Sequence, residues 1–149
     1  MNWQKDKFAI DTDKSKLDTA YIRGKLAATY WAEDIPLSIV ERSIENSLCF
    51  GVYVGAQQIG FARMITDKAS FAYLCDVFID EDYRGQGLSK WLMSAIMGHP
   101  DLQGLRRFML ATRDAHGLYR QYGFNELVAP ERWMEISVPG IYKKMKTQQ

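Results

Sequence analysis

The stretch YRGQGLSKWLMSAI, residues 83–96, joins a tight glycine turn directly to an amphipathic helix. Arg84, Gly85 and Gly87 stand in the turn, and from Leu88 onward the apolar residues recur at helical spacing. A strand that ends in such a turn places unpaired backbone N–H groups at the positive end of a helix dipole. Glycines let a bulky phosphate approach the backbone, and arginine adds a charged donor. The stretch predicts an anion-binding turn, although a simple connecting turn fits so short a pattern equally well.

Upstream of this turn the sequence predicts two helices and then three strands. A short strand near residues 7–10 precedes a helix from about Asp18 and a second helix that we expect Asp34 to cap. FGVYV and IGFARMI flank a polar loop at residues 55–58 and are typical of a β-hairpin. SFAYLCDVFI, residues 70–79, continues as a third strand, nearly apolar on both faces and therefore central in the sheet.

Downstream, the pattern returns to strand, helix and strand. RRFMLA predicts a strand, and the following two-turn helix has Asp114 as its expected cap and Gly123 at its end. Phe124 and then WMEISV, residues 133–138, are predicted to supply the last strands. The order βααβββαβαββ indicates an α/β fold with helices around a mixed sheet. We expect one domain over residues 1–142 and a polar tail over 143–149 that frays.

Composition excludes several classes of protein. The 149 residues carry a net charge of +1, which argues against a protein that coats a polyanion. A nucleic-acid interface built from Arg84, Arg106, Arg107 and the lysines of the tail is a weak alternative, since these clusters are short. Cys49 and Cys75 form no CxxC pair, so we expect two buried thiols in a reducing cytoplasm rather than a disulfide or zinc site. No signal peptide or membrane span is expected, because no apolar stretch approaches ~20 residues.

Two motifs together resemble a known family. VFIDEDYRGQGLSKWLM, residues 77–93, is similar to the acyl-CoA-binding signature Q/R-x-x-G-x-G/A of the GNAT superfamily of N-acetyltransferases. AHGLYRQYGF, residues 115–124, is similar to that superfamily's second signature, A-x-x-L-Y-x-x-x-G-F. Ser89 stands at the last position of the first signature, where the family prefers glycine or alanine, and Thr112 stands where many members have asparagine. The resemblance implies a GNAT-like mixed, mostly antiparallel sheet flanked by helices.

The resemblance also implies a reaction and a co-substrate. An acetyl group would pass from acetyl-CoA to a primary amine of a small molecule or an amino terminus, by direct attack in a ternary complex. The family pattern assigns the pantetheine arm to the backbone of a strand end and the pyrophosphate to the glycine turn. These cofactor-binding positions are Val77, Phe78, Ile79, Arg84, Gly85, Gln86, Gly87, Leu88 and Ser89.

Two residues are candidates for proton transfer. Tyr119, in the LY of the second signature, is predicted to protonate the leaving thiolate, although its spacing alone is also typical of a core aromatic residue. Asp76 interrupts an apolar run, so it is either a base with a raised pKa or a structural partner of Arg63. Tyr30, Trp31 and Glu33 are expected to border the acceptor pocket, with simple packing an equal alternative for Trp31.

A catalytically silent module that binds acyl-CoA is the main alternative function. It would share the phosphate-binding turn, and the retained Tyr119 favours the enzyme over it. Neither His99 nor His116 has neighbours that indicate a metal site. Dimers are frequent in the family, so the resemblance is also compatible with a homodimer.

Overall fold

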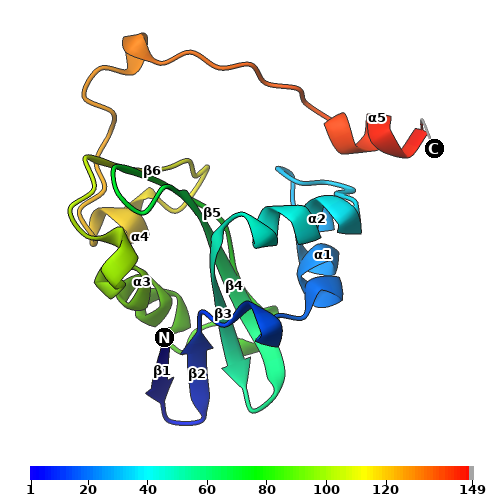
Figure 1. Cartoon of the computed structure of the whole chain (residues 1–149), viewed down its shortest axis with the longest axis vertical. Coiled ribbons are helices and arrows are strands. Elements are labelled where there is room, and N and C mark those ends of the chain that lie inside the picture. The colour runs from blue at the N-terminus through cyan, green and yellow to red at the C-terminus, as the bar shows by residue number, and fades with distance from the viewer. Residues whose placement is uncertain (148–149) are drawn as a thin grey trace.

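The computed structural model describes residues 1–147, which form one six-stranded sheet between two groups of helices (Figure 1). The strands lie in the order β1-β2-β3-β4-β5-β6 and all neighbours are antiparallel except β5 and β6, which are parallel. The strands are β1 (Asn2–Lys5), β2 (Phe8–Asp11), β3 (Leu48–Val54), β4 (Gln57–Thr66), β5 (Phe71–Ile79) and β6 (Arg107–Leu110). The helices are α1 (Thr19–Ala27), α2 (Leu37–Glu45), α3 (Leu88–Gly98), α4 (His116–Arg120) and α5 (Ile141–Thr147).

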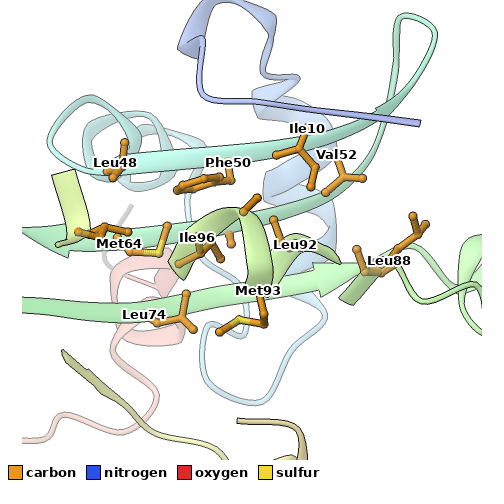
Figure 2. Packing of buried hydrophobic residues seen from close by; sticks show 14 of the residues in the cluster. Ile10, Leu48, Phe50, Val52, Met64, Leu74, Leu88, Leu92, Met93 and Ile96 are labelled. Atoms are coloured by element: carbon orange, nitrogen blue, oxygen red, sulfur yellow. The ribbon is translucent and has the colours of Figure 1, made fainter. Parts of the chain in front are cut away.

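Two hydrophobic clusters hold the helices on opposite faces of the sheet. In the first, the apolar stripe of α3 packs against the strands, with Phe50, Leu92 and Ile96 fully buried (Figure 2). In the second, α1 and α2 pack through Ile22 and Val40 against the other face. The predicted stripe of α3 is thus confirmed, and both faces of β5 are covered as its apolar sequence indicated.

A β-bulge interrupts the pairing of β4 with β5. Phe61 pairs with Phe78 and Arg63 with Cys75, so that Asp76 and Val77 together face the single residue between Phe61 and Arg63. Asp76 has φ 56°, in the left-handed region. The bulge therefore lies at the acidic residue that interrupts the apolar run of this strand.

Helix starts agree with the predictions in part. Asp18 caps α1 by accepting a hydrogen bond from the N–H of Tyr21 at 3.0 Å. Asp34 does not cap α2, because it has φ 63° and the helix begins after Pro36. Asp114 does not cap α4 either: the N-cap is Ala115, which makes no side-chain cap hydrogen bond, and the Thr112 hydroxyl accepts the N–H of Ala115 at 3.1 Å.

The predictions for the two ends of the chain need correction. β1 was not predicted, because its four residues carry little apolar patterning. Phe124 and residues 133–138 are not strands, since within residues 1–147 no strand pairs with them. The tail is not frayed over its described part: it belongs to α5, where Lys143 pairs with Glu33 at 2.9 Å. Gln148 and Gln149 of the predicted tail lie outside the described residues.

Candidate active site

The glycine turn leads into α3 in the predicted place. Gly85 and Gly87 have φ 81° and 77°, a conformation that glycine adopts without strain, and Gly87 is the N-cap of the helix. Within residues 1–147, no hydrogen-bond acceptor is found for the backbone N–H groups of residues 85–90. Arg84 donates from Nε to the carbonyl of Ile79 at 3.3 Å, which ties the turn to the end of β5. A row of free donors at a helix start is suited to bind a phosphate group.

Strands β5 and β6 separate close to this turn. Their parallel pairing ends at Leu74 with Leu110, while β5 continues to Ile79 without a neighbour on that side. The side chain of Phe78 packs against Tyr21 and Phe61, away from the open edge. Backbone groups beyond Leu74 are thus accessible from the fork between the strands.

A cavity of about 620 Å³ lies in this fork. It is bounded by β5, by the segment that follows β6, by α4 and by the loop between α1 and α2. Its walls include Tyr30, Trp31, Tyr73, Cys75, Asp76, Val77, Thr112, Arg113, Asp114 and Tyr119. Five of the predicted site residues therefore meet in one cavity, namely Tyr30, Trp31, Asp76, Val77 and Tyr119.

Tyr119 is placed to act as a proton donor. It is 9% exposed and reaches the cavity from α4, and its hydroxyl has no hydrogen-bond partner among residues 1–147. Burial raises the pKa of Tyr119, and the negative charge of Asp114 raises it further. The phenol therefore stays protonated at neutral pH and has its proton available for a ligand.

Asp76 has two side-chain partners. Its Oδ2 accepts a hydrogen bond from Arg63 Nε at 2.9 Å, and its Oδ1 accepts one from Trp31 Nε1 at 3.0 Å. Arg63 also donates to the Ser47 hydroxyl at 3.0 Å. The alternative that Asp76 pairs with Arg63 is thus confirmed.

The comparison with protein families decides the identity. The model of the acetyltransferase (GNAT) domain matches residues 45–126, which is more than half of the chain. The matched range includes the glycine turn, strands β5 and β6 and helix α4. The chain belongs to the GNAT acetyltransferase family.

Relatives agree with this assignment. A Gibberella zeae protein named as an acetyltransferase is 31% identical, over 79% of this chain and 78% of that protein. A GNAT-family crystal structure from Xanthomonas campestris pv. campestris is 55% identical with a TM-score of 0.89, covering 91% of this chain and 96% of that one. A GNAT acetyltransferase from Elizabethkingia anophelis, solved with acetyl-CoA bound, shares the fold at 14% identity and a TM-score of 0.62, covering 91% and 92%.

The rim of the cavity between β5 and β6 is aromatic. Tyr30 and Trp31 pack edge to face with ring centroids 5.1 Å apart, and the Arg113 guanidinium lies 4.0 Å from the centroid of Tyr30. Glu33 does not line the cavity, since its carboxylate pairs with Lys143 outside it. Of the three residues expected to border the acceptor pocket, Tyr30 and Trp31 line this cavity and Glu33 does not.

Sequence reasoning missed Tyr73, Cys75 and Arg113 as residues of the cavity. Tyr73 and Cys75 stand two apart on β5, so strand alternation could have placed them on one face beside the bulge. Burial raises the pKa of the Cys75 thiol to about 12, and the thiol donates to the Arg63 carbonyl at 3.4 Å. Cys75 is therefore protonated and is a poor nucleophile.

Two negative findings apply to residues 1–147. No helix there combines the length and apolar character needed to cross a membrane. No group of three or more His, Cys, Asp or Glu side chains in that part of the chain could hold a metal ion.

Proposed function

We propose that the protein is an N-acetyltransferase that transfers the acetyl group of acetyl-CoA to a primary amine of a small molecule or an amino terminus. The observation that carries this proposal is the cavity in the β5–β6 fork, where an unpaired strand edge and the hydroxyl-bearing ring of Tyr119 face the same space. Direct attack by the amine in a ternary complex fits this cavity better than an acyl-enzyme, because Cys75 is protonated.

The coenzyme would be held by backbone groups at both ends of the segment from β5 to α3. The free N–H groups of residues 85–89 would donate to the pyrophosphate, with Arg84 beside them. The amides of pantetheine would pair with the open edge at Val77, Phe78 and Ile79, as an added strand does. Ser89 lies in the first turn of α3, and its hydroxyl would be a further donor to the same phosphate.

Tyr119 would supply the proton that the leaving group needs. The amine nitrogen attacks the thioester carbon, the carbon–sulfur bond breaks, and the thiolate takes the phenolic proton of Tyr119. The pKa of a tyrosine is ordinarily about 10 and burial raises that of Tyr119 further, so its proton passes uphill to a thiolate whose thiol has a pKa near 8.5, and the phenol regains its proton from solvent. A backbone N–H of the open edge would stabilise the oxyanion, a contribution of ~3 kcal/mol or more.

Asp76 is our candidate for accepting the proton of the amine, through a bridging water. Its hydrogen bonds from Arg63 and Trp31 hold the carboxylate at the cavity wall. Because Arg63 already occupies one carboxylate oxygen, a relay that passes the proton on to solvent fits better than a proton retained on Asp76. The aromatic rings of Tyr30 and Trp31 would select the acceptor.

A panel of primary amines tests the proposed function. Acetyl-CoA is incubated with the protein and with polyamines, amino acids, aminoglycosides or amino-terminal peptides, and released free thiol is measured against a control without acceptor. We expect release that depends on one class of amine. Tight calorimetric binding of acetyl-CoA with no turnover on any amine would instead support the acyl-CoA-binding module, which the pairing of Asp76 with Arg63 makes the second candidate.

A further inference from the structure

Arg113 is a charged residue of the cavity between β5 and β6 that the proposed reaction does not use. It lies on the segment that follows β6, it is exposed, and it lines the cavity. Within residues 1–147, its guanidinium contacts an aromatic ring but forms no ion pair and donates no hydrogen bond. The N–H donors of this guanidinium are therefore available to a ligand in the cavity.

A chain of side-chain contacts positions the Arg113 guanidinium. Its central carbon lies over the ring of Tyr30, 4.0 Å from the centroid. Tyr30 packs edge to face on Trp31, and Trp31 Nε1 donates a hydrogen bond to Asp76 Oδ1 at 3.0 Å. A guanidinium that stacks on a ring uses its flat face for the ring and keeps its N–H groups, which point outward in its own plane, for hydrogen bonds. The stacking therefore orients a planar donor without occupying it.

Opposite charges lie at different depths of this cavity. Tyr119 and the side chain of Asp76 are each 9% exposed and belong to its buried part. The carboxylate of Asp114 lies near enough to Tyr119 that its negative charge raises the pKa of the phenol. Arg113, in contrast, stacks on Tyr30, which is 57% exposed and stands at the rim. The two carboxylates are thus closer to the proposed reaction centre than the guanidinium is.

Two other ligands for Arg113 fit the structure less well. The first is the pyrophosphate of the coenzyme, but the glycine turn at residues 83–90 contributes no residue to the wall of this cavity. The second is a further cation of the acceptor, as in a polyamine. Such a cation would meet the positive guanidinium at the rim, where Arg113 already covers a face of the Tyr30 ring. An anionic group of the acceptor is favoured at this position instead.

We propose that the acceptor is a small amino acid, whose carboxylate binds the Arg113 guanidinium at the rim while its amine lies beside Tyr119 and Asp76. This assignment rests on the proposed function, because it names the class of amine that receives the acetyl group. A carboxylate matches the planar guanidinium with two parallel hydrogen bonds. The carboxylates of Asp76 and Asp114 attract the amine while it is still protonated. A phosphate in place of the carboxylate is less suited, since its second negative charge would lie beside Asp114.

The size of the cavity favours a free amino acid over larger amines. Its volume is about 620 Å³, and under the proposed function the end of the pantetheine arm occupies part of it. Pockets of roughly 300–1,000 Å³ enclose one molecule of drug size, so the remaining space suits a compact acceptor. An aminoglycoside is larger than that, and the amino terminus of a peptide has no carboxylate of its own main chain close to the amine.

Matched sets of acceptors test the class of substrate. Each amino acid is compared with its amide and with the amine that lacks the carboxylate, and free thiol released from acetyl-CoA gives kcat/KM. We expect the best amino acid to exceed both relatives by about 30-fold, because they lose charge-assisted hydrogen bonds to the guanidinium. The amide is the stricter comparison, since the pKa of an amine beside an amide is about 8 and its nucleophile is readily deprotonated. Equal use of acid and amide, or turnover of polyamines or amino phosphates alone, would refute the assignment.

Substitutions of Arg113 test the residue itself. Arg113→Gln should raise the KM for the best amino acid by about 30-fold with little change in kcat, because the carboxylate is bound equally in the ground state and the transition state. Arg113→Glu should shift the preference from the amino acid to a diamine. Arg42→Gln is the matched control, since Arg42 is an exposed arginine of α2 outside the cavity, and it should keep the wild-type KM. An unchanged KM in a folded Arg113→Gln protein would overturn the proposal.

Calorimetry with coenzyme A in place of acetyl-CoA separates this inference from the proposed function, since no acetyl group can be transferred. The wild type should bind the amino acid more tightly than its amide, and Arg113→Gln should lose this difference. Such binding without turnover on any amine would count against the proposed function alone. Turnover with equal binding of acid and amide would count against carboxylate recognition alone, and a protein that binds no amino acid would also refute it.

Discussion

At the scale of single residues, Tyr119 has a position that its sequence neighbours only partly indicate. Its place in the LY pair predicts a role in proton transfer, while its helical spacing predicts burial, and the structure shows the residue buried at a cavity wall. The partners of Asp76 could be foreseen only in part. Arg63 lies on the adjacent predicted strand, but Trp31 comes from a loop 45 residues away, and no local pattern relates the two.

Tyr119→Phe tests the proton donor. We expect the turnover number to fall by about 100-fold, because the leaving thiolate loses its acid, while the dissociation constant for acetyl-CoA stays unchanged. Steady-state kinetics and calorimetry measure the two quantities. Tyr53→Phe is the control, since it removes another buried hydroxyl, one without a partner in the described residues and away from the cavity.

An unchanged turnover number in a folded Tyr119→Phe protein would remove the proposed role. The variant Asp76→Asn separates the acid from the base in the same assay. Asp76→Asn should alter the pH dependence of kcat/KM, because it removes the proposed base. Tyr119→Phe should keep the wild-type pH dependence, because Asp76 is still present.

At the scale of elements, most of the molecule follows from local patterns. The stripe of α3, the start of α1 near Asp18 and the hairpin of β3 and β4 are local, and each is confirmed. The predicted caps of α2 and α4 are wrong, because the N-caps of these helices are Pro36 and Ala115, one or two residues later, and neither makes a side-chain cap hydrogen bond. The final strands fail for another reason: a strand exists only with a partner, and the sequence of residues 133–138 does not say where that partner lies.

The turn before α3 can be tested by adding charge to it. Gly87→Glu should raise the dissociation constant for acetyl-CoA by about 100-fold, because a carboxylate repels the pyrophosphate and about two charge-assisted hydrogen bonds of ~1.5–3 kcal/mol each are lost. Calorimetry gives the constant directly.

Gly104→Glu controls for both strain and charge in that measurement. Gly104 has φ 68°, close to the 77° of Gly87, and a Cβ there meets no atom within 4 Å, as at Gly87. The control should bind acetyl-CoA normally. Equal losses in the two variants would mean that backbone strain explains the effect and that the turn does not bind phosphate.

At the scale of the whole molecule, His99 connects parts that are distant in sequence. It is 6% exposed, its ring centroid lies 6.3 Å from that of Trp3 in β1 and 5.5 Å from that of Phe50 in β3, and its Nδ1 accepts the N–H of Asp101 at 3.0 Å. His99 is the C-cap of α3, and no local sequence pattern indicates these contacts.

The stability of the fold should therefore depend on the charge of His99. Burial lowers the pKa of His99 below 6.5, the N-terminal ammonium and Lys68 act in the same direction, and Asp101 opposes them. Because the unfolded chain binds the proton more readily, the contribution is complete above about pH 6.5 and is lost as the pH falls below it.

Urea unfolding at pH 7.5 and pH 5.5 measures this loss. The free energy of unfolding of the wild type should fall more than that of His99→Asn, by no more than about 1.4 kcal/mol per pH unit, which is the limit for one proton. Asparagine keeps an acceptor for the Asp101 N–H but loses the ring contacts with Trp3 and Phe50, so the comparison rests on the change between the two pH values and not on the stability at either one. Parallel slopes for the two proteins would exclude His99 as the titrating group.

The extra residue of β5 changes which side chains each face of the sheet receives. Before the bulge the even-numbered Ala72 and Leu74 join the α3 cluster, and after it the odd-numbered Val77 and Ile79 do, while Phe78 turns to the cluster of α1 and α2. Without this change of parity, Ile79 and Phe78 would exchange sides and neither interior would fit. Natural variants shortened by one residue in this strand should therefore be rare.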